Sequence, residues 1–245
     1  MGNNIFDNDV FFENYKNLRT NSVNYNNLIE QPAMKLLMPD LKNKTVLDMG
    51  CGFGFSCVGF RKNGAAKVIG IDISEKMIKA ASEKNTDENL QFLRLDIDKI
   101  NGLGLKFDIV YSSMTMHYIV DFGEAAKKAY DVLNDKGVFL FSQEHPLLTA
   151  YATEQLWVKD EQGLKTAATV SNYLINGERN VNWMNQDVVK QHRSFSSIIN
   201  CLVDNGFSIV KVVEPEPTEQ TLELAPQMYD EFHRPTAIII KAQKR

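Results

Sequence analysis

The sequence has few cysteines and no long apolar segment. Its 245 residues include three cysteines, and an odd, scattered set does not form a disulfide framework. No apolar run approaches the length of a membrane span, and no secretory signal core is present. A hydrophobic content of 44% is ample for one α/β domain. We therefore expect a soluble, cytoplasmic protein without membrane association.

Excess positive charge and metal-ligand patterns are also missing. The formal net charge is −4 at pH 7, whereas nucleic-acid-binding domains usually carry a basic patch. The Cys and His residues lack the spacing of a zinc site. We expect no nucleic-acid partner and no metal, and either a monomer or a homodimer.

Glycine, in contrast, is concentrated in one turn. Gly50, Gly52 and Gly54 alternate after the apolar segment 45–47, which reads as a buried strand, and a helix-compatible segment begins at Phe55. Glycine is needed where the backbone takes a positive φ or where a ligand approaches closely. In an open α/β sheet, the carboxyl end of a strand is where nucleotide-like ligands bind.

The residues around these glycines distinguish between such ligands. The dinucleotide fingerprint has a glycine where this chain has Phe55, and a P-loop would place a lysine after the turn. Asp48 precedes the turn, where its carboxylate would repel a pyrophosphate but attract a cation such as a sulfonium. This pattern favours S-adenosylmethionine over a nicotinamide dinucleotide.

Two further carboxylates follow predicted strands. Asp72 follows strand 67–71, where it can accept hydrogen bonds from both ribose hydroxyls. Asp96 follows strand 90–95, where it can accept a hydrogen bond from an adenine amino group, with the Ile97 amide beside a ring nitrogen. A single acid at such a position is often only a helix N-cap. Three acids at three successive strand ends, around a glycine turn, favour one ligand site.

These segments resemble the class I S-adenosylmethionine-dependent methyltransferases, and most of all their small-molecule, type 11 and ubiquinone-biosynthesis-like group. The resemblance rests on the runs VLDMGCGFG, IGIDIS, LRLDID and FDIVYSSMTMHYI. It implies an α/β Rossmann-like sheet of order 3-2-1-4-5-7-6, with the last strand antiparallel, over residues 44–245. It also implies that residues 1–43 form a helical cap partly covering the cofactor.

The resemblance implies the cofactor-binding residues as well. Those expected in the methyltransferase domain are Asp48, Gly50, Cys51, Gly52, Gly54, Asp72, Ile73, Met77, Asp96, Ile97 and Ser112. The helical cap would add the polar-tipped side chains of Tyr15, Arg19, Tyr25 and Asn26, for which plain helix packing is the alternative.

Apolar periodicity and turn residues predict the remaining elements. Helices are expected over 55–63, from the Ser74 N-cap, over 122–133 and over 195–204; strands are expected over 107–112, 138–142, 207–213 and 236–241. The connection 145–190 is too long for an ordinary loop, and its aromatic content argues against disorder. We expect it to be a substrate lid over the carboxyl edge of the sheet.

Two histidines at that edge are candidate general bases, because His most often accepts the proton of an attacking hydroxyl. His117 follows the fourth strand and His145 the fifth. Pocket lining or packing for His117, and loop anchoring for His145, remain open. Arg193 or Arg234 would suit a substrate carboxylate, with a structural ion pair as the alternative.

The predicted function is S-adenosylmethionine-dependent methyl transfer to an O, N or C nucleophile of a small molecule, with S-adenosylhomocysteine as the product. The alternatives are a tRNA or protein methyltransferase, a non-catalytic cofactor-binding protein and a nicotinamide oxidoreductase. The N-P-P-[YF] signature of DNA-base and glutamine methyltransferases is absent, because residues 112–115 read SSMT.

Overall fold

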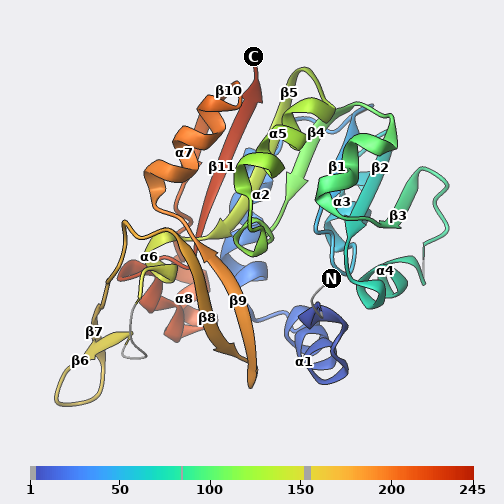
Figure 1. The fold of residues 1–245 in the computed structure, drawn as a ribbon. Coiled ribbons are helices and arrows are strands. Elements are labelled where there is room, and N and C mark those ends of the chain that lie inside the picture. Colours follow the sequence, from blue (N-terminus) through green and yellow to red (C-terminus); the bar gives the residue numbers. More distant parts are fainter. Residues whose placement is uncertain (1–3, 84, 152–155) are drawn as a thin grey trace.

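A computed structural model describes residues 4–83, 85–151 and 156–245 and has helices on both faces of a central sheet (Figure 1). The order of the seven strands is β3-β2-β1-β4-β5-β11-β10. Their bounds are β1 Thr45–Met49, β2 Lys67–Asp72, β3 Leu90–Arg94, β4 Phe107–Ser112, β5 Leu133–Glu144, β10 Phe207–Val213 and β11 Ala237–Lys244. β11 is antiparallel to both β5 and β10. The predicted order 3-2-1-4-5-7-6 and the antiparallel last strand are confirmed.

Alternate residues of the strands enter two apolar cores, because strand side chains point to opposite faces. Leu47 and Met49 of β1 pack in the core shared with α5 (Phe122–Val132), α7 (Phe195–Asp204) and η3 (Ile97–Leu103). Val46 packs on the other face, with α2 (Gln31–Leu37) and α3 (Phe55–Lys62). Asp48 shares the face of Val46 and therefore points beneath α3.

The predicted helices are confirmed, but several strand bounds were wrong. Ser74 Oγ accepts the Met77 N–H at 3.2 Å and caps α4 (Glu75–Ser82) as expected. β1 continues to Met49, so that Asp48 lies inside the strand. β5 begins at Leu133 rather than 138, because Leu133 pairs with Phe107 before a register shift. β11 continues to Lys244, which pairs with Phe207 of β10.

The amino-terminal cap and the insertion after β5 lie beyond the carboxyl ends of the parallel strands (Figure 1). The cap comprises η1 (Ile5–Asp7), α1 (Asp9–Thr20) and the π-helix η2 (Asn26–Glu30), which runs into α2. The insertion comprises α6 (Pro146–Thr149) and two hairpins, β6–β7 (Trp157–Lys159, Lys165–Ala168) and β8–β9 (Gly177–Trp183, Gln186–His192). The remaining helices are η4 (Met116–Tyr118), α8 (Glu219–Leu224) and η5 (Pro226–Phe232).

None of the helices within the described residues is long and apolar enough to cross a membrane.

Truncation of Ile240 tests the insertion of β11 into the sheet. Ile240 is fully buried and is paired with Phe141 of β5 and Val212 of β10. We expect Ile240→Ala to lower the free energy of unfolding by about 2–5 kcal/mol, because it leaves a cavity. Val210→Ala, at a half-exposed position of β10, is the control and should change it by less than about 0.5 kcal/mol. Equal losses in denaturant titrations would contradict the described core.

Candidate active site

The glycine turn between β1 and α3 has a left-handed backbone at each glycine. Gly50, Gly52 and Gly54 have φ values of 78°, 51° and 75°. A Cβ added to Gly50 would lie 2.3 Å from Thr115 Oγ1, and one added to Gly54 would lie 2.5 Å from the Phe92 ring. A Cβ on Gly52 would meet no atom within 4 Å. Two glycines are therefore required by packing, whereas Gly52 faces open space.

Hydrogen bonds from the neighbouring strand hold the turn in place. The amides of Gly50 and Cys51 both donate to the Ile71 carbonyl at 2.9 Å. Asp72 ends β2 and accepts the Gly52 N–H at 3.0 Å on one carboxylate oxygen and the Ser74 N–H at 2.9 Å on the other. Each carboxylate oxygen has a second lone pair available for a ligand hydroxyl.

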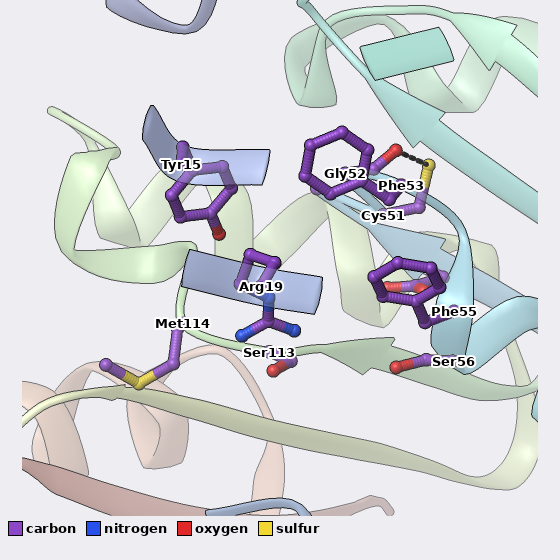
Figure 2. A pocket seen from close by; sticks show the side chains of 11 residues that line it. Tyr15, Arg19, Cys51, Gly52, Phe53, Phe55, Ser56, Ser113 and Met114 are labelled. Carbon is purple, nitrogen blue, oxygen red and sulfur yellow. Dashed lines mark hydrogen bonds between the residues drawn. The ribbon is translucent and has the colours of Figure 1, made fainter. Parts of the chain in front are cut away.

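A pocket opens between this turn, α1 and the segment after β4 (Figure 2). Figure 2 shows Tyr15 and Arg19 entering it from α1, opposite Phe53 of the turn and Phe55 at the start of α3. The full lining is Tyr15, Arg19, Asp48, Gly50, Cys51, Gly52, Phe53, Phe55, Ser56, Ser113 and Met114. The pocket volume is about 40 Å³.

Asp48 forms the acidic floor of this pocket. Its side chain is buried, and its Oδ2 accepts a hydrogen bond from Cys57 Sγ at 3.2 Å. Burial raises the pKa of Asp48 to about 7, against the lowering effect of the Cys57 hydrogen bond. A bound cation would favour the ionised carboxylate.

Sequence reasoning missed a buried glutamate behind the pocket wall. Glu30 ends the π-helix η2 and is fully buried. Its Oε1 accepts hydrogen bonds from Ser113 Oγ, at 2.9 Å, and from Ser142 Oγ. Its Oε2 accepts Gln31 Nε2 at 2.8 Å. The available signal was a lone acid within the apolar stripe from Leu28 to Leu37.

The two candidate histidines do not line the pocket. His117 Nδ1 accepts the Glu144 N–H at 3.2 Å, and burial lowers its pKa to about 4. His145 Nδ1 accepts the Leu147 N–H at 3.0 Å, and its Nε2 contacts Glu214 Oε1 at 2.8 Å. With Nδ1 already used as an acceptor, a neutral ring carries its proton on Nε2. This geometry favours packing for His117 and loop anchoring for His145, and their catalytic roles stay predictions.

The structure brings together six of the expected cofactor contacts: Tyr15, Arg19, Asp48, Gly50, Cys51 and Gly52. The others lie outside this pocket: Gly54, Asp72, Ile73, Met77, Asp96, Ile97, Ser112, Tyr25 and Asn26. Asp72 nevertheless contacts the rim of the pocket, because it accepts the N–H of Gly52. Asp96 is exposed and accepts the Asp98 N–H at 3.1 Å, as an N-cap does. Ser112 Oγ is buried and donates to the Met49 carbonyl at 2.7 Å.

The two arginines proposed for a substrate carboxylate differ in their surroundings. Arg193 donates hydrogen bonds to the carbonyls of Met116, Ile119 and Val120. These bonds give Arg193 a structural role. Arg234 and Tyr25 line a second cavity. Within the described ranges, no three His, Cys, Asp or Glu side chains are grouped as metal ligands.

Comparison with known proteins places this fold and site in one class. Residues 40–201 match the family model of a methyltransferase domain. A solved S-adenosylmethionine-dependent methyltransferase from Mesorhizobium loti is 32% identical, with a TM-score of 0.80 over 88% of this chain and 97% of that one. A Haemophilus influenzae protein without an assigned activity is 38% identical over 98% of this chain and 96% of its own length. Juvenile hormone acid O-methyltransferase of Bombyx mori is 32% identical over 51% of this chain and 47% of its own length.

The chain belongs to the S-adenosylmethionine-dependent methyltransferases. S-adenosylmethionine is the cofactor, as the sequence predicted. The residues of the turn fit this ligand. Gly52 leaves open space for a close approach, Asp72 offers acceptors to hydroxyls, and Asp48 offers a carboxylate to a cation.

Alanine at two positions of the turn separates ligand contact from packing. In Gly52→Ala we expect a loss of about 1–2 kcal/mol from the left-handed backbone and at least a ten-fold weaker affinity for S-adenosylhomocysteine, because the new methyl occupies the open space. Gly50→Ala should lose more stability, because its Cβ clashes with Thr115. Thermal unfolding and calorimetric titration measure both effects. Unchanged affinity in folded Gly52→Ala would contradict this assignment.

The raised pKa of Asp48 makes stability pH-dependent in the ligand-free protein. Between pH 3.8 and about 7 the folded state holds a proton that the unfolded state has released. This contribution to stability therefore falls as pH rises through that window. Asp48→Asn removes it. We expect the wild type to lose on the order of 2 kcal/mol relative to the variant between pH 5 and pH 7, measured by denaturant unfolding. A pH-independent difference would contradict the shift.

Proposed function

We propose that the chain transfers the methyl group of S-adenosylmethionine to an O, N or C nucleophile of a small molecule. The supporting observation is an aromatic bridge across the glycine turn, formed by α1, the β8–β9 hairpin and Phe53. The Trp183 ring lies 5.4 Å from that of Phe11 and 5.8 Å from that of Tyr15, and Tyr15 lies 6.0 Å from Phe53.

An enclosed site of this kind suits a small acceptor better than a polymer, which needs an open groove. Bound S-adenosylmethionine supplies an activated methyl group, so the protein mainly has to align the acceptor and exclude water. The bridge would exclude water from above. The lid predicted over 145–190 corresponds in this proposal to the β8–β9 hairpin.

Glu30 is a better placed proton acceptor than either histidine. Ser113 lines the pocket and donates to Glu30 Oε1. If the nucleophile is a hydroxyl, its proton can pass to Ser113 Oγ while the Ser113 proton passes to the Glu30 carboxylate. This path uses groups already in hydrogen-bond contact.

The Bombyx mori relative, whose name describes O-methylation of juvenile hormone acid, supports a small acceptor. Its similarity covers about half of each chain. The net charge of −4 remains unfavourable for a tRNA substrate. Methyl transfer to a small acceptor in a radiolabel assay would separate an enzyme from a cofactor-binding protein without turnover.

Cofactor titration tests this function directly. We expect both S-adenosylmethionine and S-adenosylhomocysteine to bind to folded protein, and Asp72→Ala to weaken both at least ten-fold, because two hydroxyl acceptors are lost. Asp98→Ala removes the same charge from an exposed position on η3 and should leave both affinities unchanged.

Calorimetry that detects neither ligand in folded wild-type protein would overturn the proposed function. Equal affinities in the Asp72 and Asp98 variants would overturn only the role of Asp72.

A further inference from the structure

A second cavity, of about 310 Å³, lies at the same edge of the sheet as the glycine turn but beside β11. Its wall includes Thr236, which immediately precedes β11 and whose carbonyl accepts the His145 N–H. Trp157 and Lys165 enter it from the β6–β7 hairpin, and Tyr25 from the segment before η2. None of these residues lines the pocket at the glycine turn.

One side chain in this cavity has donors without a hydrogen-bond partner within the described part of the chain. Arg234 is 7% exposed, and its Nε and Nη1 are both buried and unpartnered. Unpaired buried donors are costly and rare in native proteins. The guanidinium therefore points to a ligand that accepts hydrogen bonds.

Among the described residues around the cavity, Arg234 is the cation without an ion-pair partner, and the nearby Glu231 and Asp230 carboxylates favour its charged form. Lys165 pairs with Asp230. Glu231 accepts the Thr236 N–H at 2.7 Å and its hydroxyl at 2.6 Å. No carboxylate of the described residues lies within ion-pair distance of Arg234, whose guanidinium stacks 4.5 Å from the Trp157 ring centroid.

We propose that this cavity binds the carboxylate of the methyl acceptor through Arg234, with Trp157 against the adjoining apolar part. The inference rests on the proposed function and adds the class of acceptor. One unpaired guanidinium between two acidic side chains suits a monoanion better than a phosphate dianion. The planar fork of arginine matches both oxygens of a carboxylate.

The sheet also sets the length of this acceptor. Ser113 follows β4 and Thr236 precedes β11, and β5 lies between these strands. Strand spacing and the register along β5 separate the two residues by roughly 10–15 Å. An acceptor that reaches from the cavity to Ser113 would therefore span about that distance.

Calorimetric titration of the full chain with three probes of equal chain length tests the site. Without cofactor we expect octanoate to bind with 1:1 stoichiometry, and octyl phosphate and octylamine to bind at least ten-fold more weakly. Arg234→Gln should weaken octanoate at least ten-fold. Arg245→Gln removes the same charge at the exposed end of the described chain and should leave octanoate binding unchanged.

The outcomes separate this inference from the proposed function. Equal octanoate affinity in Arg234→Gln and the wild type, or equal binding of octylamine, overturns the carboxylate site. Tighter binding of octyl phosphate assigns the cavity to phosphate and also overturns it. If Arg234→Gln does not fold, two other measurements test the site. These are the octanoate affinity of Arg234→Lys and the relative affinities of the wild type for the three probes. We expect the Arg234 variants to bind S-adenosylhomocysteine as tightly as the wild type. If the wild type binds no S-adenosylhomocysteine, the proposed function is overturned, and octanoate binding would then show a carboxylate site that serves no methyl acceptor.

Discussion

The buried carboxylate of Glu30 ties the amino-terminal cap to the catalytic edge of the sheet. It accepts hydrogen bonds from Ser113 and Ser142, which stand at the ends of adjacent strands. An unpaired carboxylate in this position would carry a large desolvation cost, so the two hydroxyls and the helix must come together. Because η2 leads into α2 and follows α1, this cluster also limits where α1 can lie over the glycine turn.

Local signals in the sequence predicted the backbone of the glycine turn and the helix cap that follows the second strand. Alternating glycines after an apolar segment predict positive φ values, and all three glycines have them. The Ser74 cap is likewise a short-range interaction that the sequence displays directly. The sheet order came from the resemblance of whole segments to a known family, since neither periodicity nor spacing determines where β11 inserts.

The acceptor side depends on contacts between distant residues, which no local pattern reveals. Glu30 meets Ser142 across more than a hundred positions, and Arg234 meets Trp157 only because η5 packs against the β6–β7 hairpin. For the two candidate histidines, the structure adds contacts that the sequence did not show, and their catalytic roles stay predictions. Their place after strands suggested catalysis, whereas Nδ1 of each ring is occupied by a backbone amide. Asp96 accepts an amide hydrogen bond in its own turn through Oδ1, and its contact with adenine stays a prediction.

The sulfur atoms beneath the glycine turn have a chemical consequence. A Cβ on Gly70 would lie 2.9 Å from both Cys51 and Cys57, so the two thiols fill the space that this glycine leaves. Burial raises the pKa of Cys57 well above its ordinary value. Oxidants and alkylating reagents attack the thiolate form of a cysteine. The buried position of Cys57 disfavours that form. Cys57, which donates a hydrogen bond to Asp48 beneath the glycine turn, is thereby less reactive toward such reagents than an exposed thiol.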